Sequence, residues 1–337
     1  MSLARRPLAR RLLRLAVSLA ILAALLAWVG WRPLLDALSQ AAPGWVAVGV
    51  VLALLANSVC AWRWRALARH LGHEVTPHWA WVAYLRGQAL NAVLPGATVG
   101  GDVWRAWALH REGMPLARAS ASVVLDRLSG LWALVLLGGA VSAAALVVGL
   151  PPGAWPGLRG LAMPAAGGLL GLATLALALA PLVLLRVGAR LPWAQRSWWR
   201  AWGESAQRDA VGLWAQQLGL SLMAQLATVA ALMAAARALD LPLAWWWLVP
   251  AAAPIFIAAA LPVGLGGWGT REAAAVAVLG LLGVPAAQAV AVSVLFGLYP
   301  LLQAPLGLLP LPRTEVLPVA GVHDADGTTQ PGAGGRY

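Results

Sequence analysis

The chain has 337 residues, of which 61% are hydrophobic and only 11% are charged. A soluble domain carries about 25% charged residues, and the mean hydropathy here is +0.75, so the composition excludes a soluble protein and predicts a polytopic membrane protein. All 24 basic residues are arginine, and the formal net charge is +12. Arginines of a membrane protein gather beside anionic lipid head groups on the cytoplasmic side, so this charge does not indicate a nucleic-acid partner.

The first part of the chain is expected to cross the membrane twice. Met1–Arg14 contains five arginines, and the apolar run Leu15–Val29 follows it, which predicts an uncleaved first span with its N-terminus in the cytoplasm. Residues 32–43 are predicted to be a short outer loop, and Gly44–Trp62 the second span. Three arginines after this span return the chain to the cytoplasmic side: Arg63, Arg65 and Arg69.

Residues 79–110 are predicted to form a re-entrant helical hairpin. Its first arm, Trp79–Leu94, is about 16 residues long and reaches only about 24 Å, which is short of a ~30 Å hydrocarbon core. Pro95 and Gly96 break the helix at the tip, and the return arm begins near Gly101. The two arms carry residues that a lipid-facing span would lack: Arg86, Gln88, Asn91, Asp102 and Arg105.

The remaining segments alternate between apolar spans and polar or Pro/Gly-rich connections. Ala119–Val148 is a long span with Asp126 and Arg127 in its first turns. A second hairpin is expected over residues 248–282. Its backbone is irregular from Pro262 to Gly269, and such backbone at membrane depth must be buried in protein or line a cavity. Three further spans and a disordered tail complete the prediction: 161–185, 211–236, 285–309 and the tail 310–337.

The two halves of the chain, residues 1–149 and 161–309, follow the same order of span, span, hairpin and long span. Because the first half starts inside and the second outside, we predict an all-α fold of about six full spans and two broken hairpins in an inverted repeat, as in many secondary transporters. Alternatively, Pro and Gly loops connect ordinary spans and the similarity is chance. Eight residues of the hairpin tips are predicted to form moving gates: Pro95, Gly96, Gly100, Gly101, Pro262, Gly264, Gly266 and Gly267.

Charged residues gather at both hairpins, where apolar surroundings make an unpaired charge costly. Arg105 and Arg271 are predicted to hold a phosphate or carboxylate bidentately. The nearby acids Asp102, Asp126 and Glu272 are predicted to orient or neutralise them. Alternatively, these residues form internal ion pairs, for example Arg105 with Asp126 or Arg271 with Glu272. The predicted substrate-binding set is Arg105, Arg271, Asp102, Asp126, Arg127, Glu272, Asn91 and Arg86.

Arg271 and Glu272 are neighbours in sequence, at the start of the return arm of the second hairpin. Adjacent residues on a helix point about 100° apart. We therefore expect that the two side chains do not easily satisfy each other, and that at least one of them faces a different partner.

A short run of histidines follows the second span, at a position where a metal site is conceivable. The run is interrupted by Gly72 and Pro77, so no helix holds its members on one face, and a fourth ligand is not evident. No enzymatic motif stands out either. We expect neither a metal nor a cofactor at these histidines: His70, His73 and His78.

Four short motifs, occurring together and in order, resemble those of a known membrane family. They are Asn91-x3-Pro95, Gly100-Gly101-Asp102-x2-Arg105, Asp126-Arg127-x2-Gly130 and Gly266-Gly267-x3-Arg271-Glu272. Over roughly residues 10–310 the chain is similar to the lysylphosphatidylglycerol synthase transmembrane region, also called the flippase-like or UPF0104 family. The resemblance implies movement of lipids between leaflets, and it links stand-alone members to hopanoid or polyprenyl-glycan pathways.

The chain departs from that family in two respects. It carries no aminoacyl-transfer domain, so lipid lysylation is not expected of it. Its last span has Phe296-Gly297 where many relatives are expected to have a basic residue. A charge contact is therefore not expected at that position.

These observations together predict a flippase-like transporter, not an enzyme, that moves an anionic or polyprenyl-type lipid across the bacterial inner membrane. Both termini are predicted to be cytoplasmic. Two alternatives stay open: an integral-membrane enzyme or accessory subunit acting on lipid-linked sugars, and a structural membrane partner without transport. The expected partners are membrane lipids and, alongside them, enzymes of lipid biosynthesis.

Overall fold

The computed structural model describes residues 31–93, 100–148, 164–187, 209–241, 243–260 and 268–311, together with the single positions 23 and 27. The regular structure in these ranges is helical, and they contain no β-strand. The predicted all-α polytopic membrane protein is confirmed, because five described helices are long and apolar enough to cross a membrane: Pro43–His70, Leu116–Val148, Pro164–Arg186, Ala210–Ala238 and Ala286–Leu308.

The described helices follow the predicted order of elements. Those of the first half are α2 (Trp31–Ser39), α3 (Pro43–His70), α4 (Pro77–Val93), α5 (Gly100–Arg111) and α6 (Leu116–Val148). Those of the second half are α7 (Pro164–Val187), α9 (Ala210–Ala238), α10 (Trp245–Ala260), α11 (Thr270–Leu281), α12 (Ala286–Gln303) and the short 3-10 helix η4 (Ala304–Leu308). The first predicted span lies outside the described residues, apart from positions 23 and 27, as does the predicted tail from residue 312 onward.

The expected outer loop at residues 32–43 is wrong, because α2 occupies most of it. Pro33 lies in the first turn of this helix, where proline costs no intrahelical hydrogen bond. The helix has one apolar side, and Leu34 on that side is buried against Val290 and Ala291 of α12. Burial of this face stabilises a helix that is short on its own.

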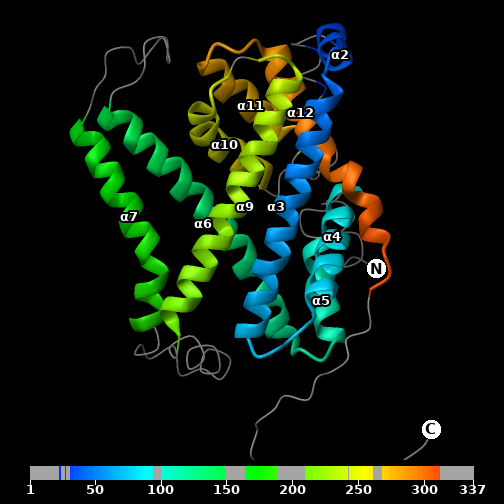
Figure 1. Ribbon diagram of the computed structural model, residues 1–337, viewed down its shortest axis with the longest axis vertical. Helices are drawn as coiled ribbons and strands as arrows, with labels where there is room; N and C mark the ends of the chain where they lie inside the picture. Colours follow the sequence, from blue (N-terminus) through cyan, green and yellow to red (C-terminus); the bar gives the residue numbers. More distant parts are fainter. Residues whose placement is uncertain are drawn as a thin grey trace, which may run out of the picture.

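The two hairpins lie toward opposite ends of the molecule (Figure 1). The cyan and teal pair α4–α5 lies in the lower half of the view, and α10–α11 lies in the upper half. The first arms are 17 and 16 residues long, too short to span a ~30 Å core. The structure therefore places two short helices at each predicted hairpin. The hairpin tips lie outside the described residues, and the re-entrant hairpins and the division into two inverted halves stay predictions.

α3 and α9 form the central helix pair of the molecule. They stand side by side in Figure 1 and make the most extensive contact among the described helices. The pair belongs to different halves, since α3 precedes the first hairpin and α9 precedes the second. Any group on their shared faces is therefore held between the two halves.

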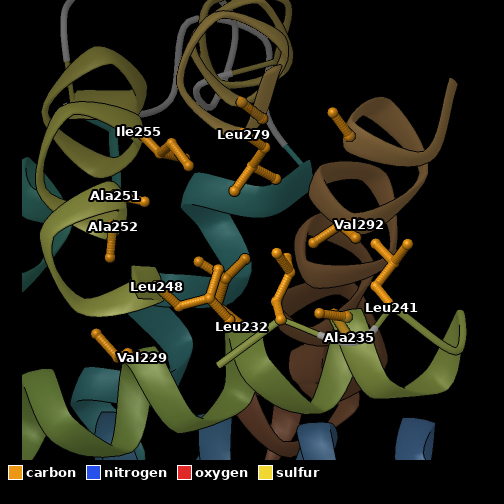
Figure 2. Packing of buried hydrophobic residues seen from close by; sticks show 14 of the residues in the cluster. Val229, Leu232, Ala235, Leu241, Leu248, Ala251, Ala252, Ile255, Leu279 and Val292 are labelled. Atoms are coloured by element: carbon orange, nitrogen blue, oxygen red, sulfur yellow. The ribbon is translucent and has the colours of Figure 1, made fainter. Parts of the chain in front are cut away.

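Among the described residues, the largest buried apolar cluster lies in the second half, among α9, α10, α11 and α12. Figure 2 shows part of this cluster, where Leu232 of α9 lies next to Leu248 of α10. Leu279 of α11 and Val292 of α12 belong to the same cluster. Small residues such as Ala252 let the helices approach closely, which is the usual basis of helix packing in membranes. This packing fixes α11 against α12, and both helices carry residues of the second charged cluster.

Candidate functional site

Asp126 of α6 is the centre of the first charged cluster. It lies on the buried face of α6 with Ala119 and Ser122, because residues three and four apart share one side of a helix. Asp126 Oδ1 accepts a hydrogen bond of 2.9 Å from Arg63 Nε, and Oδ2 accepts one of 2.9 Å from Arg105 Nη2. One buried carboxylate therefore joins two arginines that come from α3 and α5.

Arg63 was missed by the sequence analysis, which counted it only as a marker of the cytoplasmic side. Its side chain is 3% exposed. Nη2 donates to the backbone oxygen of Asp126 at 2.9 Å, and Nη1 donates to Ser221 Oγ of α9 at 3.1 Å. Arg63 therefore fastens α3 to both α6 and α9, the helix from the other half.

Arg105 is completely buried in a cage of aromatic rings. Its guanidinium carbon lies 4.3 Å from the ring centres of both Trp64 and Tyr84, and aromatic faces attract cations. Its side chain is 0% exposed. Within the part of the chain that the structure describes, Nε and Nη1 of Arg105 have no hydrogen-bond partner, although Nη1 lies 3.6 Å from Asp102 Oδ1.

Asp102 and Arg127 extend this cluster toward the surface. Arg127 Nε and Nη2 donate to the two oxygens of Asp102 at 2.8 and 2.9 Å, a bidentate pair between α5 and α6. The Arg127 side chain is 44% exposed. The first cluster, defined as Arg63, Arg105, Arg127, Asp102 and Asp126, thus links three arginines to two carboxylates and keeps an excess of one positive charge.

The second charged cluster consists of Arg271, Glu272 and Ser293. Arg271 Nη2 lies 2.7 Å from Glu272 Oε1, and Ser293 Oγ of α12 donates to the same oxygen at 2.9 Å. The expectation that Arg271 and Glu272 do not easily satisfy each other is wrong, because the two side chains pair, but the expectation that at least one of them has a different partner is confirmed, since Arg271 Nε also donates to Ser293 Oγ. Both residues lie in the first turn of α11, where Glu272 folds back to accept from Gly269 N at 2.6 Å, the geometry of an N-terminal cap. The long Arg271 side chain bends in the same direction and reaches Glu272 Oε1.

The two internal ion pairs that the sequence offered as an alternative to substrate binding therefore both form. Arg105 pairs with Asp126, and Arg271 pairs with Glu272. Six of the eight predicted residues thereby fall into two separate groups, one in each half. Their roles in binding a substrate stay predictions.

Gly297 of α12 lies where many relatives are expected to have a basic residue, and its surroundings explain why none is needed there. A Cβ atom built on Gly297 would lie 2.0 Å from Arg271 Nη2 and 2.7 Å from its guanidinium carbon. The absence of a side chain therefore makes room for the guanidinium group, which also lies 4.8 Å from the ring centre of Trp268. Arg271 of α11 therefore places a positive charge beside the position in α12 where many relatives are expected to have a basic residue.

A ladder of side-chain amides runs between the first hairpin and the end of α12. Gln88 Nε2 donates to Asn57 Oδ1 at 3.1 Å, Asn57 Nδ2 donates to Gln303 Oε1 at 2.7 Å, and Gln303 Nε2 donates to Val50 O at 3.1 Å. Asn57 and Gln303 were not singled out from the sequence. The sequence feature that could have identified them is a polar residue inside an apolar span, because a buried amide needs hydrogen-bond partners.

Asn91 and Arg86, both predicted to bind substrate, hold the first hairpin in place. Asn91 Oδ1 accepts a hydrogen bond of 2.8 Å from Gly101 N, which joins α4 to the start of α5. Arg86 Nε donates to Gly307 O at 2.8 Å, and Nη2 donates to Leu309 O. Neither residue contacts the first cluster through an ion pair in the described chain.

Of the eight predicted gate residues, Gly100 and Gly101 are described, and the other six lie outside the described residues. Gly101 is buried against α4: a Cβ atom there would lie 1.9 Å from Gly87 O and 2.7 Å from Asn91 Oδ1. Only glycine allows this approach of the two backbones. α5 is thereby seated close enough to α4 for Arg105 to lie beside Tyr84.

Comparison with known proteins identifies the family of this chain. The family described as the lysylphosphatidylglycerol synthase TM region matches residues 12–307. The chain belongs to this family. It is also similar to a UPF0104 membrane protein of Methanocaldococcus jannaschii, with 25% identity over 114 residues. That match covers 34% of this chain and 34% of the relative, so the chain spans about a third of the length of the curated relative it matches.

Membership of the lysylphosphatidylglycerol synthase transmembrane-region family confirms the resemblance drawn from the four motifs. The matched region includes every α-helix that the structure describes, and both charged clusters. The chain is therefore a multi-pass membrane protein of a lipid-related family. The lipid and the process remain to be argued from the clusters themselves.

Proposed function

We propose that this family member moves an anionic or polyprenyl-type lipid between the leaflets of the bacterial inner membrane, with both termini in the cytoplasm. The head group would pass the first cluster, and the α4–α5 and α10–α11 hairpins would move to admit and release it. Membership of a lipid-related membrane family supports the class of substrate. The charge balance of the first cluster supports the sign of its head group.

The observation that carries the proposal is the uncompensated positive charge of the first cluster. Three arginines meet two carboxylates there, and Arg63, Arg105 and Asp126 are almost wholly buried. An isolated charge in a membrane interior is costly, and ionisable groups there commonly mark substrate or ion pathways. A phosphate or phosphodiester entering the cluster would balance this excess, and it could accept from the Arg105 Nε and Nη1 groups that lack partners within the described chain.

In this structure the first cluster is closed to a lipid head group. Gly101 is packed on Gly87, and Arg105 is 0% exposed behind Trp64 and Tyr84. A head group would therefore reach Arg105 only after α5 separates from α6. The Asp102–Arg127 pair spans that boundary at the partly exposed edge, so its opening is the natural first step.

The test is leaflet exchange in vesicles that contain the purified chain, with fluorescent phosphatidylglycerol as the anionic lipid and fluorescent phosphatidylcholine as the zwitterionic one. Arg127→Gln removes the excess charge, and because the Asp102–Arg127 pair is partly exposed it should cost about 1 kcal/mol of stability or less. We expect phosphatidylglycerol exchange to fall about tenfold, the rate equivalent of roughly 1.4 kcal/mol. Arg127→Lys retains the charge and should retain most of the exchange.

Arg237→Gln is the matched control. Arg237 is an exposed arginine in the last turn of α9, so the substitution removes the same charge far from the cluster. It should leave exchange unchanged. Equal exchange by wild type, Arg127→Gln and Arg237→Gln would contradict a role for the excess charge. Absence of exchange by well-folded wild type for both lipids would contradict lipid movement altogether.

A further inference from the structure

A groove lies on the outer side of the central helix pair, away from both charged clusters. It has a volume of about 410 Å³ and lies between α3 and α9, with the start of α4 at one end. Ligand pockets for small molecules and head groups are commonly about 300–1,000 Å³. The lining residues are Trp62, Arg65, Ala66, Arg69, Pro77, Gln216 and Leu220.

α3 divides its arginines between the first cluster and this groove. Arg63 points to Asp126, whereas Arg65 and Arg69 line the groove. Residues two apart on a helix lie about 200° apart around its axis, and residues four apart lie on one side. The pair at positions 65 and 69 therefore presents two guanidinium groups on the same face, opposite to the buried one.

The positive charge of the groove is not balanced within the described chain. Arg65 Nε donates to Val75 O at 2.7 Å, and neither Arg65 nor Arg69 takes part in an ion pair among the described residues. Asp209, an acid at the nearby start of α9, is used differently, because its Oδ1 caps that helix by accepting from Gly212 N at 3.0 Å. No acidic residue is among those lining the groove.

The other groove residues provide an amphipathic wall. Trp62 is 50% exposed and lies about two turns before the C-terminal end of α3, and tryptophan is a residue that suits the boundary between head groups and acyl chains. Leu220 adds an apolar contact, and Gln216 adds an amide donor. Pro77 is the first residue of the 17-residue helix α4, whose N-terminal end contributes further positive potential.

From this combination we propose that the groove binds the phosphate head group of an anionic phospholipid, held by Arg65, Arg69 and Gln216 with its glycerol and upper acyl chain against Trp62 and Leu220. A diacyl lipid is favoured over free phosphate because four of the seven lining residues are apolar and the groove opens beside a membrane span. The site is separate from the first and second clusters, so the inference does not rest on the proposed transport. It assigns α3 a second, lipid-anchoring role at its arginine-rich end.

The test is native mass spectrometry of the purified full chain, released from mild detergent after incubation with phosphatidylglycerol, phosphatidylcholine or inorganic phosphate. We expect the wild type to retain one phosphatidylglycerol in preference to phosphatidylcholine, and millimolar inorganic phosphate not to displace it. Arg65→Gln/Arg69→Gln should weaken retention at least about tenfold, as the loss of charge-assisted hydrogen bonds predicts. Arg32→Gln/Arg237→Gln, which removes two exposed arginines elsewhere, should retain the lipid as wild type does.

If the double variant does not fold, Arg69→Gln alone decides the question, because Arg69 is exposed and its side chain makes no hydrogen bond or ion pair to another described residue. It should weaken retention in the same direction by a smaller factor. Unchanged phosphatidylglycerol retention in folded Arg69→Gln and in the double variant would overturn the proposal. Equal retention of phosphatidylcholine, or displacement by inorganic phosphate, would also overturn it, the first in favour of an apolar groove and the second in favour of a free-anion site.

Discussion

The two halves of the molecule hold their buried charges in different ways. In the first half, Asp126 is shared by Arg63 and Arg105, and these three residues come from three separate helices. In the second half, Arg271 and Glu272 are neighbours on α11 and neutralise each other, with Ser293 of α12 bonded to both. The first cluster is a junction between helices with positive charge in excess, and the second is a local neutral pair.

This difference teaches which cluster is sensitive to the arrangement of the helices. A pair within one helical turn persists when that helix moves as a rigid body. A carboxylate that bridges α3 and α5 from α6 loses a partner as soon as one of these helices moves, and a buried charge without its partner is strongly unfavourable. The first cluster is therefore where movement of a hairpin would change the electrostatic energy most.

The largest effect is expected for Asp126→Asn. The amide keeps the size of the side chain but presents an N–H donor toward one of two arginines, so a buried guanidinium group is left against a donor. We expect a loss of roughly 5 kcal/mol, the upper end of the range for a broken buried ion pair. SDS titration in mixed micelles measures the free energy of unfolding, and Asp36→Asn on the exposed side of α2 is the control. A loss below about 1 kcal/mol would show that Asp126 is not the junction described here.

Arg271→Leu is expected to destabilise the chain by roughly 3 kcal/mol, because it strands Glu272, whose side chain is 0% exposed. The double variant Arg271→Leu/Glu272→Gln should be more stable than the single one by at least about 1 kcal/mol, since the pair is neutral and its removal leaves no charge behind. The glutamine retains an acceptor for Gly269 N. The same titration measures both variants, and a double variant less stable than Arg271→Leu would refute the description of a self-contained pair.

Gly297→Ala should have the smallest of these effects, a loss of about 1–3 kcal/mol from crowding. The new methyl group would meet the Arg271 guanidinium 2.0 Å away and force it from its place between α11 and α12. Gly280→Ala in α11 is the matched control, because a Cβ atom there has no neighbour within 4 Å and alanine favours the helix. If both variants are equally stable, Arg271 does not depend on the space at Gly297.

Much of the fold could be predicted because its signals are local. Apolar runs long enough to span a membrane gave the order of the elements, and a short arm followed by Pro or Gly indicated each hairpin. The pairing of Arg105 with Asp126 was also foreseen as an alternative, since few opposite charges are present inside the membrane region. Residues 32–43 were misread as a loop because the helix there is stabilised by burying Leu34 against α12, a contact with distant sequence.

The sequence by itself determined that the chain is a multi-pass helical membrane protein, that its hairpins carry charges, and which residue types are present to hold an anion. Only the tertiary structure decided which arginine of α3 is buried. Arg63, Arg65 and Arg69 look alike in sequence, yet Arg63 meets Asp126 and Ser221 while the other two line a groove. The reason is that the rotation of α3 about its axis is set by packing against α6 and α9, whose contacting residues lie 63 and 158 positions away along the chain, and no local pattern encodes that angle.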